Sequence, residues 1–273
     1  MNKYLRILPV FLAVSALFFF GCGGGDGSGN TGDHFGPAPE GLVHYWPLNG
    51  DANDGVEGGI DLSPGQSPNW VNDAEWGRTV LETDTNSDVY YALPFDQDFG
   101  SPGYGELTVA FWIKQRDVSA RLNNIFKLEE GTNENGWFFY FAINMGYIGL
   151  SNAGFDETGF GTIDEGKYAG KWTHYALTFE PGKAALFING YSYGPPVTGD
   201  DGSGEFSKLP SWNNGTGHFD IRAPLLDTIT IGGEFPGQYF DGRIADFRMY
   251  NRVLSADEIL AVYGLAPAAV RGK

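Results

Sequence analysis

The sequence predicts an all-β fold in which two antiparallel sheets pack face to face, with one short helix near the C-terminus. Three observations predict it: short runs in which apolar and polar residues alternate, turn-forming residues between those runs, and one amphipathic segment with helix start and stop signals. Alternation with a period of two is typical of strands that bury one face, and frequent turns between such strands favour antiparallel pairing.

Two long runs show the alternation most clearly. In residues 107–114 leucine, valine, phenylalanine and isoleucine recur at every second position, and residues 172–179 alternate in the same way. Further strands are expected at residues 43–48, 89–93, 137–143, 184–189 and 228–231. Since side chains of a strand point alternately to its two faces, each run presents one apolar face to a common core.

The turn chemistry after residue 179 predicts a meander of three strands. Glu180-Pro181-Gly182-Lys183 has Pro and Gly at the two central positions, as a type II turn requires. Asn189-Gly190 is a hairpin signal because both residue types tolerate positive φ. Residues 177–179, 186–188 and 191–193 should therefore pair in sequence.

The predicted helix begins after Ser255. Ser255 and Glu258 have the spacing of a capping box, in which each side chain binds the other residue's backbone N–H. The helix should end at Gly264, ahead of Pro267. Its apolar face consists of Ile259, Leu260, Val262 and Tyr263.

Composition excludes several classes of function. The chain has 273 residues with 17 basic and 34 acidic side chains, a net charge of −17, and one cysteine. Such acidity argues against nucleic-acid binding, which needs clustered cations to neutralise phosphates. One cysteine excludes an intramolecular disulfide framework and any multi-cysteine metal site. The length suits one large β domain or two small ones.

The N-terminus predicts a signal peptide over residues 1–21. Lys3 and Arg6 precede an apolar run, Ile7–Phe20, of about 14 residues, which is shorter than the ~20 that a membrane-spanning helix needs. Cys22 follows Gly21, and the segment resembles the bacterial lipoprotein signal, in which the cysteine is lipidated after cleavage. The alternative is ordinary secretion with an incidental cysteine.

A lipidated Cys22 would anchor the chain at the cell envelope, at the outer membrane if the cell has two membranes. Stable anchoring needs more than one acyl chain, and lipidation of this kind supplies several. The glycine-rich residues 22–40 have no apolar periodicity and should form a flexible tether between the anchor and the folded body.

Five segments of the body resemble laminin-G-like domains of the concanavalin A-like lectin/glucanase family, and they occur in the family's order. They are Gly41–Leu48, Leu107–Ile113, Lys171–His174, Leu186–Gly190 and Phe240–Ile259. The resemblance implies a jelly-roll sandwich over residues 41–264, followed by a short tail at 265–273. It also implies frequent calcium binding and frequent roles in carbohydrate binding or adhesion.

A calcium site is expected where the first strand ends. Asn49–Gly55 supplies several oxygen ligands in one glycine-rich turn, among them Asp51 and Asp54, and oxygen is the ligand that calcium prefers. In the resembled family this loop meets the aspartate of the last strand, which is Asp246 here. The alternative is that these residues only form turns.

Exposed aromatic rings are the other expected binding elements, because they pack against the apolar faces of sugars. Trp212, in the long segment of residues 194–226, is the first candidate, and Tyr104, Trp137 and Tyr147 are further ones. For each of them the alternative is a ring packed onto the sandwich. The strand tryptophans Trp46, Trp112 and Trp172 should instead belong to the core.

Catalytic motifs were not found. Jelly-roll glucanases carry Glu-x-Asp-x-x-Glu on one strand, and this sequence has no such motif. We therefore expect a non-catalytic envelope lipoprotein that binds a glycan or another surface ligand and contacts the membrane only through its lipid. A protein–protein adhesion module is the alternative, and a glycoside hydrolase of the same fold is the further alternative.

Overall fold

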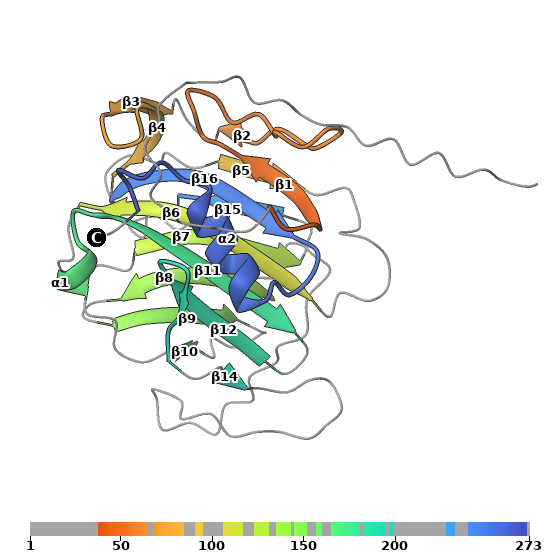
Figure 1. The fold of residues 1–273 in the computed structure, drawn as a ribbon. Coiled ribbons are helices and arrows are strands. Elements are labelled where there is room, and N and C mark those ends of the chain that lie inside the picture. The colour runs from red at the N-terminus through yellow and green to blue at the C-terminus, as the bar shows by residue number, and fades with distance from the viewer. Residues whose placement is uncertain are drawn as a thin grey trace, which may run out of the picture. The chain divides into compact units, whose positions relative to one another are not determined.

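The computed structural model describes residues 38–64, 68–84, 91–94, 106–116, 123–130, 135–142, 145–151, 157–159, 165–180, 183–194, 197–198, 228–232 and 240–271. Strands in these ranges form two antiparallel sheets (Figure 1), which confirms the predicted all-β sandwich. Within the same ranges, no helix has both the length and the apolar character needed to cross a membrane.

The first sheet has nine strands in the order β13-β12-β11-β6-β16-β4-β3, and β1 and β14 pair with β16 and β12. Its strands are β1 (Leu42–Trp46), β3 (Asn69–Asp73), β4 (Arg78–Thr83), β6 (Leu107–Gln115), β11 (Trp172–Glu180), β12 (Lys183–Ile188), β13 (Tyr191–Ser192), β14 (Val197–Thr198) and β16 (Gly242–Tyr250). The predicted meander is present as β11, β12 and β13. Its second turn has positive φ at Asn189 and Gly190, as the hairpin signal requires.

The second sheet has seven strands in the order β10-β9-β8-β7-β15-β5-β2. They are β2 (Ser63–Pro64), β5 (Tyr91–Pro94), β7 (Asn123–Glu130), β8 (Asn135–Ala142), β9 (Met145–Ser151), β10 (Glu157–Gly159) and β15 (Thr228–Ile231). The sequence did not single out β7, β9 or the β3–β4 hairpin, nor the one-turn helix α1 (Glu165–Tyr168).

The main core lies between the sheets. Phe111 of β6 packs against Phe126 of β7 with ring centroids 5.6 Å apart, and against Phe247 of β16 at 5.5 Å. Each of these rings is at most 1% exposed. The residues of β6 and β11 that alternation assigned to the core are therefore among those that join the two layers.

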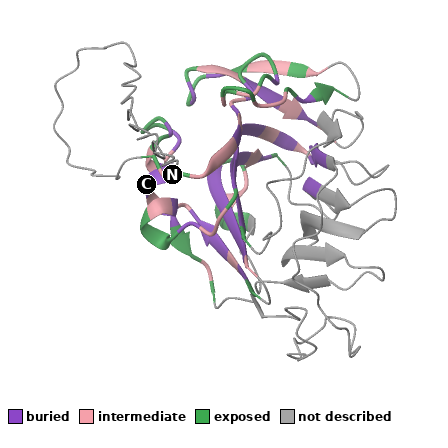
Figure 2. Ribbon diagram, turned by 90° about the vertical axis from the view of Figure 1, so that its right-hand side faces the viewer, coloured by how far each residue is buried: buried purple, intermediate pink, exposed green. Residues whose placement is uncertain are grey.

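The opposite face of the nine-stranded sheet is also buried, because helix α2 (Ala256–Gly264) lies across it (Figure 1). Trp112 and Trp172, expected in the core, are buried on this outer face, where they pack with Trp76 and Tyr263. Figure 2 accordingly shows purple, buried residues along most of the described strands of this sheet. The helix thus supplies a second core on the outside of the sandwich.

The predicted capping box holds the start of α2. Ser255 Oγ accepts from the backbone N–H of Glu258, and the Glu258 carboxylate accepts from that of Ser255 at 2.8 Å. Arg252 also pairs with Glu258, at 2.5 Å. The C-terminal tail expected from residue 265 onward is not free of the body, because Ala266 and Val270 are buried in the outer cluster.

His174 lies in this outer cluster, 1% exposed, between the rings of Trp112 and Tyr263. Neither ring nitrogen finds a hydrogen-bond partner within the described residues. Burial lowers the pKa of His174 to about 3, against the smaller opposing effect of the Asp246 carboxylate. Between about pH 3 and 6.5 the imidazole is therefore neutral in the folded protein, whereas the unfolded chain, with its ordinary pKa of 6.5, takes up a proton there.

We expect the free energy of unfolding to fall as the pH drops from about 6.5 towards 3, because only the unfolded state protonates His174 in that window. The loss should reach the order of 4 kcal/mol at the acid end. Urea unfolding of the wild type and of His174→Phe across this range measures it. The variant keeps the ring but cannot titrate, so a pH dependence equal to that of the wild type would contradict the assignment.

Candidate functional site

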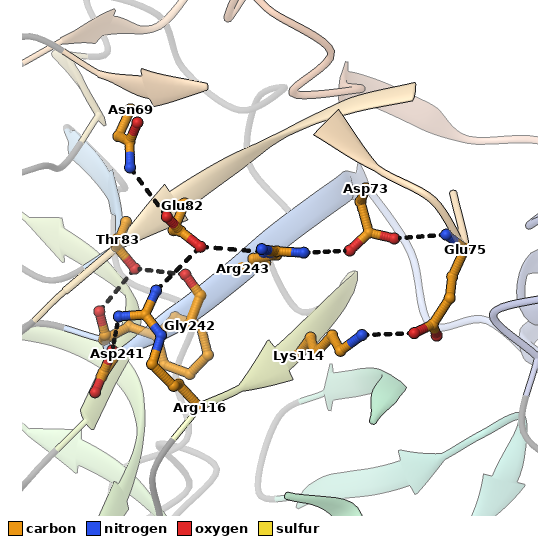
Figure 3. Close-up of polar contacts among 11 residues, drawn as sticks. Asn69, Asp73, Glu75, Glu82, Thr83, Lys114, Arg116, Asp241, Gly242 and Arg243 are labelled. Carbon is orange, nitrogen blue, oxygen red and sulfur yellow. Dashed lines mark hydrogen bonds and ion pairs between the residues drawn. The ribbon is translucent and has the colours of Figure 1, made fainter. Parts of the chain in front are cut away.

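A concavity of about 290 Å³ opens on the outer face of the nine-stranded sheet, beside the area that α2 covers. We call it the hollow, and it is lined by Glu82, Lys114, Gln115, Arg116, Gly170, Gly242 and Arg243. Its volume is near the lower end of the range for small-molecule sites. Figure 3 shows the polar side chains in and around it.

Strand register explains why charged side chains gather here. Glu82 of β4, Arg243 of β16 and Lys114 of β6 lie directly opposite one another across three neighbouring strands. Residues paired in this way share one face of a sheet, with Cβ atoms about 5 Å apart. The next residue along β16, Ile244, pairs with core residues and faces inward, so the charged row faces outward.

Ion pairs fix each cation of the hollow. Arg243 donates to Asp73 at 2.7 Å and to Glu82 at 3.1 Å. Arg116 donates to the same Glu82 oxygen at 3.0 Å and to Asp241 at 2.8 Å, so two guanidinium groups share one carboxylate (Figure 3). Lys114 pairs with Glu75 at 2.6 Å. Because the backbone N–H of Glu75 donates to Asp73 at 2.9 Å, the cluster is a continuous network across β3, β4, β6 and β16.

Backbone forms part of the lining at Gly242. A Cβ atom there would lie 2.4 Å from the Lys114 carbonyl oxygen and 2.9 Å from the Phe240 ring, so any side chain would force β16 away from β6. Thr83 strengthens the same region by donating from Oγ1 to the Phe240 carbonyl at 2.7 Å. The geometry of the hollow is thus set by close strand packing.

Asp73 anchors the network from a buried position. Burial raises the pKa of Asp73, but hydrogen bonds from Arg243 and from the backbone N–H of Trp76 and Glu75 outweigh it, and the pKa lies below its ordinary value. The same contacts raise the pKa of Arg243. Both groups are therefore charged at neutral pH, and Asp73 carries no proton to donate.

Two of the three expected calcium ligands bind groups of the chain itself. Asp54 accepts from His44 Nδ1 at 2.5 Å and from the backbone N–H of Tyr45, Val56 and Ile60. Although burial raises the pKa of Asp54, these hydrogen bonds leave it below the ordinary value. Asp51 is exposed and caps the turn by accepting from the backbone N–H of Asn53.

Asp246 has a cation of the chain beside it. Its carboxylate accepts from the Arg248 guanidinium at 3.0 Å, and this guanidinium also lies 3.9 Å from the centre of the Tyr45 ring. Both members of the pair are buried. Across the described ranges, no three His, Cys, Asp or Glu side chains come together as metal ligands. Calcium binding by Asp51, Asp54 and Asp246 stays a prediction.

Sugar binding by the aromatic candidates stays a prediction. Trp212 and Tyr104 lie outside the described residues, as does the expected lipidation site Cys22. Trp137 belongs to β8 and Tyr147 to β9, both in the seven-stranded sheet. The residues that line the hollow were not predicted, although the outward positions of residues 107–114 already placed Lys114 on the exposed face of its strand.

Comparison with known proteins identifies the family. A family model described as the concanavalin A-like lectin/glucanases superfamily matches residues 85–260. A comparison with curated proteins gave no match.

Solved structures share the fold at low sequence identity. Domain 4 of AbnA, a GH43 extracellular arabinanase from Geobacillus stearothermophilus solved in complex with arabinotriose, is 14% identical with a TM-score of 0.57, and the match covers 81% of this chain and 98% of that one. The binding domain of botulinum neurotoxin serotype G is 14% identical with a TM-score of 0.59, covering 82% and 51%.

A structure of botulinum neurotoxin type C is 12% identical with a TM-score of 0.57, and the match again covers 82% of this chain and 51% of that one. Cell entry of that toxin is described as dependent on interaction with two ganglioside molecules. The chain therefore spans about half the length of these toxin structures. At this level of identity the likeness establishes the fold alone.

Because Arg248 already neutralises Asp246, we expect the response of the urea midpoint to a chelator to be the same in the wild type and in Asp246→Asn. Arg248→Met should lower the free energy of unfolding by about 3 kcal/mol, since it leaves a buried carboxylate unpaired. The double variant Asp246→Asn/Arg248→Met should recover part of the loss. A midpoint that falls with chelator and returns with calcium in the wild type, but not in Asp246→Asn, would contradict this expectation.

Proposed function

Because the chain belongs to the concanavalin A-like lectin/glucanase superfamily, we propose that its sandwich binds carbohydrate in the hollow without hydrolysing it. The observation that carries the proposal is the hollow itself. It is a concave site whose donors and acceptors are held in place by the ion pairs of Lys114, Arg116 and Arg243.

The geometry suits hydroxyl groups. A sugar hydroxyl both donates and accepts, and an arginine–carboxylate pair presents N–H donors and oxygen acceptors side by side. Since the pairs already fix these side chains, a ligand would order few of them on binding, which lowers the entropic cost. Two proteins of similar fold support this ligand class: one was solved with arabinotriose, and the other depends on gangliosides.

The electrostatics favour binding over hydrolysis. A glycosidase needs one carboxylic acid whose raised pKa keeps a proton for the leaving group. Beside the hollow the pKa of the buried Asp73 is lowered, so that this carboxylate holds no proton to give. Glu82, which lines the hollow, accepts from two arginines and can also accept a hydrogen bond from a bound sugar.

The envelope location is part of the same proposal. A signal peptide with lipidation at Cys22 would leave a tether of about 18 residues, with a mean reach of roughly 25 Å, ahead of the sandwich. Such a chain would present its carbohydrate site outside the membrane. This part of the proposal rests on the sequence alone.

We expect Lys114→Gln to weaken oligosaccharide binding at least fivefold, because it removes a charged donor at the hollow and releases Glu75. Isothermal titration with arabinotriose and a panel of neutral trisaccharides, with reducing ends assayed afterwards, measures affinity and hydrolysis together. Lys183→Gln is the matched control, since Lys183 forms an ion pair with Glu180 outside the hollow.

The outcomes separate the alternatives. Binding that is weakened by the first variant and unaffected by the second, without new reducing ends, supports the proposal. New reducing ends would indicate a glycoside hydrolase. Absence of binding to every glycan, together with capture of an envelope protein, would indicate an adhesion module and overturn the proposal.

A further inference from the structure

We infer that the hollow selects uncharged oligosaccharides over acidic ones such as uronic-acid or sulfated glycans. The inference rests on the proposed function and adds the class of sugar. The observation behind it is that each of the three cations lining the hollow already has a carboxylate within 3.1 Å. An acidic sugar would have to displace one of these carboxylates to gain a cation.

The charge of the cluster opposes such a displacement. Within the described residues its three cations face four carboxylates, which gives a formal charge of −1. The four are Asp73, Glu75, Glu82 and Asp241. Asp73 cannot move away easily, because it is buried and also binds the backbone N–H of Glu75 and Trp76. The chain as a whole, at −17, repels anions as well.

A neutral sugar does not need to displace a carboxylate. Its hydroxyls can accept from Lys114 and from the half-exposed Arg116, and can donate to Glu75 and Asp241, while every ion pair stays intact. Recognition of this kind neutralises no net charge, so screening by salt should change the affinity little. Weak salt dependence and discrimination against acidic sugars therefore follow from the same arrangement.

One exposed pair offers a gain-of-function test. Glu75 is the partner of Lys114, and its side chain is 47% exposed, so Glu75→Gln frees the ammonium group with little effect on the fold. Glu180→Gln is the matched control, because it frees Lys183 in a comparably exposed pair outside the hollow. Both variants change the net charge of the chain by the same amount.

The experiment titrates the wild type and both variants with arabinotriose and with trigalacturonate, at 50 and 500 mM NaCl. We expect the wild type to bind arabinotriose with dissociation constants that agree within about twofold at the two salt concentrations, and to bind trigalacturonate at least tenfold more weakly. The Glu75→Gln variant alone should gain trigalacturonate affinity, and 500 mM NaCl should abolish the gain.

Tighter binding of trigalacturonate than of arabinotriose by the wild type would overturn the inference while leaving carbohydrate binding intact. Equal gains in the two variants would also overturn it, because the effect would then come from overall charge. Failure of the wild type and both variants to bind either sugar, or any glycan of the neutral panel, would overturn the proposed function itself.

Discussion

The fold depends on a change of partner in the middle of strand β16. One edge of β16 pairs with β6 along most of its length, whereas the other edge pairs first with β4 and then with β1. The register shifts between Ala245 and Arg248, and Asp246 at the shift has φ of 57° and donates its backbone N–H to the Pro47 carbonyl. The buried Arg248 side chain compensates the charge of Asp246 there. The same guanidinium lies 3.9 Å from the centre of the Tyr45 ring of β1, and this contact links the closing strand to the first strand.

The same strand positions the hollow. On the β4 side of the shift, Gly242 lets β16 approach β6 closely, and Arg243 stands between Glu82 and Lys114. Beyond the row of Trp112 and Trp172, helix α2 and the following segment bury the outer face. The hollow lies at the border of this covered area. A strand irregularity, a close backbone contact and a covering helix together leave a polar site of about 290 Å³.

Much of the fold could be predicted from the sequence because its signals are local. The alternation in β6 and β11, the Asn189-Gly190 turn and the Ser255–Glu258 capping box each act over a few residues, and the structure contains all of them. Alternation also puts Trp112 on the face opposite Phe111. Which element buries that face depends on long-range packing by helix α2, which the local pattern does not report.

The hollow could not be predicted for a related reason. Its charged groups come from widely separated segments, and only strand register brings Glu82 and Arg243 together, 161 positions apart in the chain. The expected calcium ligands show the opposite case, in which the residue types were recognised but their partners were not. Asp54 and Asp246 have the residue types for a metal site, but a histidine, backbone N–H groups and an arginine bind their oxygens. The residue types at a turn do not show which donor will bind their carboxylate oxygens.

The central claim is that carbohydrate binds in the hollow on the outer face of the nine-stranded sheet. The most direct measurement follows the arginine side-chain Nε–H resonances of the ¹⁵N-labelled protein during titration with arabinotriose. The account predicts that the signals of Arg116 and Arg243 shift with a common affinity, while that of Arg252, paired with Glu258 outside the hollow, stays in place. Shifts confined to other signals, such as the indole N–H of Trp212, would contradict the claim.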